Sequence, residues 1–137
     1  MLTFRFDLES WEEDKETLFE NRNEPQNYPS PSICFSYKTD RTSFDVEFHD
    51  NIHPISTWRE FANKVKNGEE TNIVFRESNG YTGIDVSGNE TRFTVAFYGV
   101  GGSSSLYFTV PTADCIDCFN VIPGEMEKLI GETLNSF

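Results

Sequence analysis

Hydrophobic residues alternate with polar ones along much of this chain, and this period of two constrains the fold more than any other feature. Between residues 71 and 110 the alternation recurs in four short segments, separated by turn residues such as Ser78-Asn79-Gly80 and Gly88-Asn89. Such alternation is typical of strands with one buried face and one solvated face. It predicts a four-stranded antiparallel meander. The expected inward-facing residues are Ile73, Phe75, Ile84, Val86, Phe93, Val95, Phe97, Leu106, Phe108 and Val110.

The same period occurs in the first third of the chain. Residues 2–8 alternate and predict one strand. Residues 33–37 and 44–48 also alternate, and Asp40-Arg41 lies in the turn between them. Two alternating runs on either side of a short turn predict a β-hairpin.

Two segments at opposite ends of the chain are expected to be helical. Ser10 and Glu13 have the spacing of a capping box, which predicts a helix from Trp11 to about Glu20. Thr112 is expected to cap a C-terminal helix, which Pro123-Gly124 would break into two pieces because proline interrupts the helical hydrogen bonds. The apolar residues of this last helix are Ile116, Phe119, Met126, Leu129 and Ile130.

A third helix is indicated in the middle of the chain. Thr57 and Glu60 form a second possible capping box, and Gly68 follows as a C-cap residue. Between them the apolar residues recur at helical spacing and are expected to face the core. They are Trp58, Phe61, Ala62 and Val65.

These elements together predict an α+β fold. We expect an antiparallel sheet of about 6–7 strands, made of a hairpin and a C-terminal meander, with two or three helices packed on one face. The chain length of 137 residues fits a single domain spanning residues 1–137. Residues 21–32 contain three prolines and no periodicity, and they predict an irregular Pro/Asn-rich loop.

The composition indicates a folded protein of a reducing compartment. The 13 Phe, 5 Tyr and 2 Trp supply large buried areas although hydrophobic residues make up only 36%. Three Cys cannot form a complete disulfide framework, and residues 1–7 do not have the pattern of a signal peptide. No apolar stretch is long enough to cross a bilayer. We therefore expect a cytoplasmic protein without a membrane partner.

A Cys-x-x-Cys motif lies at the expected start of the last helix. A helix N-terminus lowers the pKa of a thiol at Cys115 or Cys118, which a redox dithiol would need. Asp114 and Asp117 flank these thiols and oppose thiolate formation. We therefore expect both cysteines to be reduced and structural.

Other residues that could carry chemistry do not form a known motif. His49 and His53 could join Cys115 and Cys118 as a tetrahedral zinc set, but their order and spacing match no common zinc module. The Gly/Ser-rich residues 99–105 lack the ending of a phosphate-binding loop and predict a flexible hairpin loop. We expect no catalytic residue, metal or cofactor. The alternative is a small metal- or thiol-dependent enzyme that uses His49, His53, Cys115 and Cys118.

The charge of the chain is strongly negative, with 11 Lys and Arg against 23 Asp and Glu and a net charge of −12. Residues 9–24 contain 7 acids and 2 bases, and residues 112–137 contain 5 acids and 1 base. Such a chain is a poor ligand for nucleic acid, whose phosphates require basic residues. The acidic segments are either solvated helix faces, as in a structural or assembly module, or a docking surface for a basic protein.

The profile of a small, acidic, aromatic-rich chain without a catalytic motif is similar to that of bacterial inhibitor and immunity proteins. It also resembles small phage inhibitors that mimic DNA. The resemblance implies a stoichiometric binding protein whose partner is a basic protein, such as a nuclease toxin. The expected contact residues are acids that steer the encounter and exposed aromatics that anchor it. They are Glu12, Glu13, Asp14, Glu16, Trp11, Tyr28 and Tyr98.

Overall fold

The computed structural model describes residues 1–49, 53–99 and 101–137, and within these ranges the chain forms seven strands, three α-helices and two short 3-10 helices. Their order along the chain is β1 (Leu2–Phe6), α1 (Leu8–Glu20), η1 (Pro25–Asn27), β2 (Ile33–Lys38), β3 (Ser43–Phe48), α2 (Ile55–Lys66), β4 (Thr71–Glu77), β5 (Gly80–Ser87), β6 (Glu90–Gly99), β7 (Gly102–Pro111), η2 (Thr112–Asp114) and α3 (Ile116–Asn135). The predicted α+β class is confirmed.

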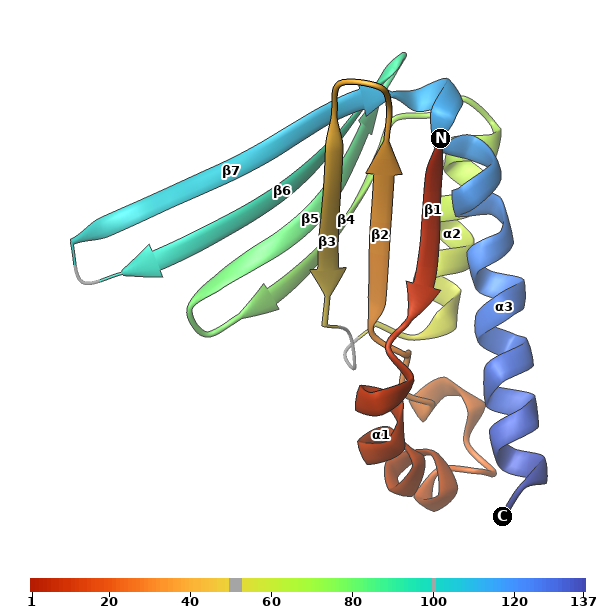
Figure 1. Cartoon of the computed structure of the whole chain (residues 1–137). Helices are drawn as coiled ribbons and strands as arrows, with labels where there is room; N and C mark the ends of the chain where they lie inside the picture. Colours follow the sequence, from red (N-terminus) through yellow and green to blue (C-terminus); the bar gives the residue numbers. More distant parts are fainter. Residues whose placement is uncertain (50–52, 100) are drawn as a thin grey trace.

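The strands lie in two antiparallel sheets, where the sequence predicted one. Sheet A has the strand order β1-β2-β3, and sheet B has the order β4-β5-β6-β7. The helix α2 separates β3 from β4 in the chain, and the two sheets pack face to face instead of pairing edge to edge (Figure 1). Phe48 of sheet A contacts Phe75 of sheet B at a centroid distance of 5.0 Å, and Phe44 stacks on Phe108 at 4.5 Å. Burial of these rings favours the two-layer arrangement.

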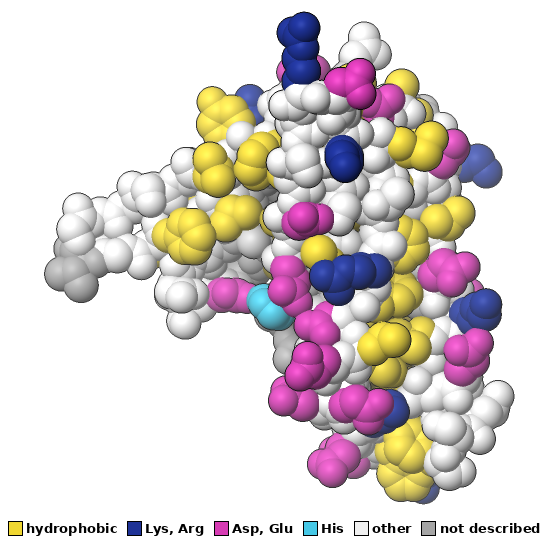
Figure 2. Space-filling view, in the orientation of Figure 1, with side chains coloured by type: hydrophobic (Ala, Val, Ile, Leu, Met, Phe, Trp, Pro, Cys, Tyr) yellow, Lys and Arg dark blue, Asp and Glu magenta, His cyan; other side chains and the backbone are white. Residues whose placement is uncertain are grey.

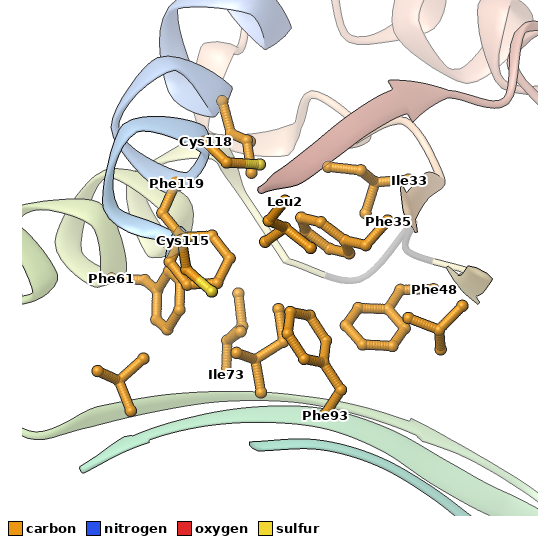
Figure 3. Close-up of a cluster of buried hydrophobic side chains, with 14 of the residues drawn as sticks. Leu2, Ile33, Phe35, Phe48, Phe61, Ile73, Phe93, Cys115, Cys118 and Phe119 are labelled. Atoms are coloured by element: carbon orange, nitrogen blue, oxygen red, sulfur yellow. The ribbon is translucent and has the colours of Figure 1, made fainter. Parts of the chain in front are cut away.

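Helices α2 and α3 run side by side and close one side of the space between the sheets (Figure 1). Phe119 of α3 lies at the centre, 6.0 Å from Phe35 of sheet A and 6.4 Å from Phe93 of sheet B. It also contacts Phe61 of α2 at 5.0 Å. Figure 3 shows how side chains from both sheets and both helices converge on this core.

Helix α1 begins three residues earlier than the predicted start. Asp7 is the N-cap residue, and its carboxylate accepts a hydrogen bond of 3.1 Å from the backbone N–H of Ser10. The predicted capping box of Ser10 and Glu13 is therefore wrong. Because the helix begins at Leu8, that side chain does not continue the buried face of β1 and is 60% exposed.

Helix α2 also begins earlier than predicted but ends where the sequence indicated. It starts at Ile55 after Pro54, without a side-chain cap, so the capping box of Thr57 and Glu60 is wrong. At the other end Gly68 has a φ of 73°, and its N–H donates to the carbonyl of Val65. The N–H of Glu69 donates to the carbonyl of Lys64, which completes a Schellman motif and confirms Gly68 as the residue that ends the helix.

Helix α3 is continuous through Pro123, so the predicted break is wrong. The buried residues Phe119, Ile122, Met126 and Ile130 lie on both sides of the proline along one face. Burying each such side chain stabilises by about 1.5–3 kcal/mol, which together exceeds the roughly 3 kcal/mol cost of an interior proline. Thr112 does not cap α3; it begins η2, and its hydroxyl hydrogen-bonds the hydroxyl of Thr91 at 3.0 Å.

The Gly/Ser-rich segment is mostly strand, so its prediction as a flexible loop is wrong. Strand β6 continues to Gly99, and β7 begins at Gly102, which pairs with it. Ser105 of β7 pairs with Ala96 of β6, and Val100 lies outside the described residues. Pairing of the two backbones outweighs the low strand preference of glycine. The resulting long hairpin projects from the rest of the molecule (Figure 1).

Candidate functional site

Helix α1 carries the acidic residues that the sequence predicted as partner contacts. Glu12, Glu13 and Glu16 are exposed, and Asp14 is half-buried. Within α1 there are six acidic side chains and one base, Lys15. Across residues 1–49, 53–99 and 101–137, the structure records one ion pair on this helix, between Lys15 Nζ and Glu12 Oε1 at 2.6 Å. The helix surface is therefore strongly negative, and Figure 2 shows acidic side chains gathered over this part of the molecule.

The spacing of these acids opposes helix formation in the free protein. Glu9 and Glu13, Glu12 and Glu16, and Glu16 and Glu20 are each four residues apart on a helix. Like charges at this spacing destabilise a helix by about 0.2–0.5 kcal/mol per pair. Glu20 also lies at the negative end of the helix dipole, and no base lies in the last turn.

Burial and a like charge act together on Asp14. The pKa of its carboxyl is raised, first by burial and then by the neighbouring charge of Glu13. Burial removes the hydration that favours the charged carboxylate, and the charge of Glu13 repels it. A basic group brought close to α1 would lower this pKa again.

The aromatic residues predicted as anchors are not gathered on α1. Trp11 is only 2% exposed, so its prediction as an exposed anchor is wrong. Its side chain faces inward, where α1 packs on α3. Tyr28 is half-buried, and its hydroxyl donates to the carbonyl of Arg22 at 2.7 Å. Tyr98 is 50% exposed, but it lies near the end of β6, far from α1 (Figure 1).

Tyr28 lines a groove of about 480 Å³ between η1, the start of α2 and the end of α3. The groove is mainly apolar, and Ile55 and Leu134 form part of its wall. The ion pair of Arg59 with Glu127 also lines it. Tyr28, Ile55 and Leu134 pack on the small cluster of Trp11, Leu18 and Ile130 that anchors α1. The groove is thus continuous with the packing beneath the acidic helix.

The outer face of sheet A extends the acidic surface beyond α1. Glu47 hydrogen-bonds Asp7, which raises the pKa of Glu47. The pKa of Asp7 is lowered, chiefly by the Ser10 N–H and then by Glu47. Cys34 lies on the same face, paired with Arg5 and Glu47 along the sheet, and burial raises the pKa of its thiol. A protonated thiol in acidic surroundings is a poor nucleophile.

The four residues of the alternative zinc set are not brought together. His49 is exposed beyond β3, whereas the Nε2 of His53 donates to the carbonyl of Val74 at 2.6 Å. Cys115 and Cys118 are buried at the start of α3. No group of three or more His, Cys, Asp or Glu side chains suited to a metal ion occurs among the described residues.

The Cys-x-x-Cys motif belongs to the hydrophobic core. Burial raises the pKa of the Cys115 thiol to about 12, with a further contribution from the charge of Asp114. Burial and the neighbouring Cys115 raise the pKa of Cys118 to about 12. The sequence predicted that the pKa values of these thiols are raised, and this is confirmed. The main cause is burial rather than the flanking acids. The thiol of Cys115 donates to the carbonyl of Pro111 at 3.6 Å.

A second exposed surface was not anticipated from the sequence. The distal part of the β6–β7 hairpin, residues 95–99 and 101–107, is called the arm here. The side chains of the arm are uncharged, and Figure 2 shows hydrophobic and uncharged groups on its visible face. Four large ones are at least half exposed. They are Phe97 at 56%, Tyr98 at 50%, Leu106 at 57% and Tyr107 at 56%.

The signal that could have revealed the arm is the absence of charge. Residues 93–113, which are 21 consecutive positions, contain no Asp, Glu, Lys or Arg, in a chain of which 25% is charged. The alternation in this stretch predicted strands correctly. It did not indicate that the inner face of the meander would extend beyond the residues that cover it.

No helix in the part of the chain that the structure describes has the length and apolar character needed to cross a bilayer.

Comparison with protein families identifies residues 41–121 as a match to a family of unknown function, DUF5766. The chain belongs to the DUF5766 family. The comparisons with curated proteins and with solved structures gave no match. The DUF5766 match covers β3, α2, all of sheet B and the start of α3, so it includes the arm. Helix α1 lies outside the matched residues.

Proposed function

We propose that this protein is a non-catalytic binding protein that docks a basic protein through α1. The observation that carries the proposal is that α1 contains six acidic residues and only one basic residue, with acids repeatedly placed four residues apart. That spacing costs helix stability in the free protein, and a basic partner would remove the cost by neutralising the acids. A stoichiometric inhibitor of a nuclease toxin fits this chemistry, because an enzyme that binds nucleic acid presents a basic surface.

The apolar groove beside α1 supplies an anchoring site, which charged residues alone do not provide. Exposed charges raise the association rate but contribute little affinity, whereas tight interfaces have apolar anchors at their centre. The groove lined by Tyr28, Ile55 and Leu134 is apolar and large enough for a side chain of the partner. In this proposal Glu12, Glu13 and Glu16 steer the encounter, and the groove holds the complex.

The experiment measures association rates with a panel of purified basic nuclease toxins at low and high ionic strength. The α1 variant combines Glu12→Gln, Glu13→Gln, Asp14→Asn and Glu16→Gln. The control removes four exposed acids elsewhere, by Glu69→Gln, Asp117→Asn, Glu125→Gln and Glu132→Gln. Screening acts over about 8 Å at physiological salt, so steering should be strongest at low salt.

We expect the α1 variant to lose at least about tenfold in association rate at low salt, and the control to lose far less. The α1 variant should also be more stable than the parent chain by about 1 kcal/mol, since three like-charge pairs are removed. Equal losses in both variants would show that only net charge matters. No binding by any toxin in the panel would leave the acids with a solubilising role and contradict the proposal.

The same material tests nucleic acid as a partner. The low content of basic residues predicts that neither DNA nor RNA is retained in a mobility-shift assay at low salt, where phosphate attraction is strongest. A shift at low salt would contradict the assignment of a basic partner.

A further inference from the structure

Strand β7 lies at the edge of sheet B. Among the described residues, no strand pairs with its outer side. Sheet B has the order β4-β5-β6-β7, so β7 pairs with β6 on one side only. An exposed strand edge presents a row of backbone N–H and C=O groups that can pair with another strand. Proteins usually protect such edges with lysine, proline or a bulge. Residues 102–108 of β7 contain no charged residue and no proline.

Each face of the arm carries large exposed apolar or aromatic side chains near this edge, beside the small serines 103–105. Phe97 and Leu106 lie on the face that continues the core, as shown by the registers of Phe97 with Ser104 and of Val95 with Leu106. Tyr98 and Tyr107 lie on the opposite face. A strand added to this edge would therefore cover apolar surface on both sides of the sheet.

The charge distribution indicates which partner fits this edge. The rest of the chain carries the entire net charge of −12, so two copies repel each other over most of their surfaces. A basic partner is attracted to the acidic faces, and the apolar groove beside α1 already supplies its apolar contacts. A second copy needs an uncharged surface, because symmetric pairing places like residues close together and like charges across strands are destabilising. The uncharged residues 102–108 of β7 provide that surface.

Symmetry and side-chain size together select the register. A two-fold axis perpendicular to a continuous antiparallel sheet keeps each face on the same side. One residue must therefore pair with the same residue of the second copy, and the axis lies midway between the two. An axis at Ser105 places Leu106 opposite Ser104 of the second copy and Tyr107 opposite Ser103 of the second copy. Each large side chain then faces a small one. The paired residues 102–108 extend over about 24 Å at roughly 3.4 Å per residue.

We propose that this protein forms a symmetric homodimer by antiparallel pairing of β7 with β7 of a second copy, centred on Ser105. The two copies of sheet B become one eight-stranded sheet, and each arm lies beside the body of the other copy. The dimer leaves α1 free. This inference does not depend on the proposed function, and each can fail without the other.

The first experiment is sedimentation of the purified full-length chain over a range of concentrations. We expect a mass of about twice 15.7 kDa, falling toward the monomer on dilution. Ser105→Glu places two negative charges across the axis and should weaken dimerisation at least about tenfold. The matched control is Ser43→Glu on β3, another exposed strand serine that becomes acidic, and it should leave the dimer unchanged.

The second experiment tests the symmetry of the contact. Ser105→Lys alone should also be monomeric, whereas an equimolar mixture of Ser105→Lys and Ser105→Glu should recover the dimer. Ser105→Cys should form a covalent dimer under mild oxidation, and Ser43→Cys should not. The native cysteines are buried and do not interfere.

Each remaining outcome overturns the proposal. If the chain stays monomeric at high concentration, a second copy does not pair with β7, and an extended peptide of a different protein becomes the next candidate for that edge. A dimer that survives Ser105→Glu uses another surface. Circular dichroism and the melting temperature of each variant show whether the fold is intact, so loss of the dimer is not confused with unfolding.

Discussion

The indole Nε1 of Trp11 donates a 3.0 Å hydrogen bond to the hydroxyl of Thr133, a residue 122 positions away in the sequence. Both side chains are buried, and the Thr133 hydroxyl in turn donates to the carbonyl of Leu129 at 2.7 Å. This connection joins α1 to the last turns of α3. It holds the acidic helix in place through an interior contact, not through its charged surface.

Thr133→Val should lower the free energy of unfolding by about 1–3 kcal/mol, because the buried indole N–H loses its acceptor. The same substitution in a Trp11→Phe background should cost much less, since no N–H is then left unsatisfied. Denaturant unfolding of the parent, the two single variants and the double variant measures this coupling. Equal losses in both backgrounds would mean that the hydrogen bond contributes nothing.

Trp58→Ala should destabilise the fold rather than remove a binding contact. The indole is 0% exposed and contacts Phe61 at a centroid distance of 6.1 Å and Phe75 at 5.7 Å. Truncating a core tryptophan costs about 3–5 kcal/mol, which is a large part of the stability of a small domain. Val121→Ala, at a half-exposed position on α3, is the control and should change stability by less than about 0.5 kcal/mol. A Trp58→Ala protein that melts like the parent would contradict the core assignment.

The buried thiols of Cys115 and Cys118 should make the protein less stable in alkali. Their pKa values in the fold are about 12, above the ordinary value of 9.0. Between pH 9 and pH 12 the unfolded chain releases thiol protons that the folded chain retains, so stability is fully present below pH 9 and is lost as the pH rises toward 12. Each thiol contributes a slope of up to about 1.4 kcal/mol per pH unit.

The double variant Cys115→Ala with Cys118→Ala isolates this effect. It should be less stable at pH 7 because of the lost packing, yet its stability should fall less steeply above pH 9. Unfolding free energies at several pH values measure both quantities. The parent thiols should also resist alkylation until the protein is unfolded. Rapid alkylation of the folded protein at pH 8 would contradict their burial.

Gly80→Ala should disrupt the pairing of β5 with β6. A Cβ at residue 80 would collide with the backbone carbonyl oxygen of Ala96, which cannot move without shifting β6. We expect the free energy of unfolding to fall by about 1–3 kcal/mol. Gly83→Ala is the matched control on the same strand, because its Cβ would lie at an ordinary 3.5 Å from the nearest atom. Similar stability of the two variants would show that the close approach at Gly80 can relax.

Local patterns predicted the elements well but their ends less well. The alternation of Phe93 and Val95 identified β6, and Gly68 marked the end of α2, because both signals act within a few residues. The capping boxes at Ser10 and Thr57 failed, since Asp7 was better placed for α1 and Pro54 allowed α2 to begin earlier. The acids of α1 were found from the sequence, whereas the groove at Tyr28 brings together three segments of the chain.

The sequence by itself determined the α+β class, the strand and helix periods, and the negative charge of α1, because these depend on neighbouring residues and on composition. Only the tertiary structure decided that Trp11 is buried against Thr133, that α3 continues through Pro123, and that the strands divide between two sheets. It also decided that β6 and β7 extend beyond their cover to form the arm. These outcomes follow from long-range burial, whose free energy outweighs local preference and cannot be read from any one segment.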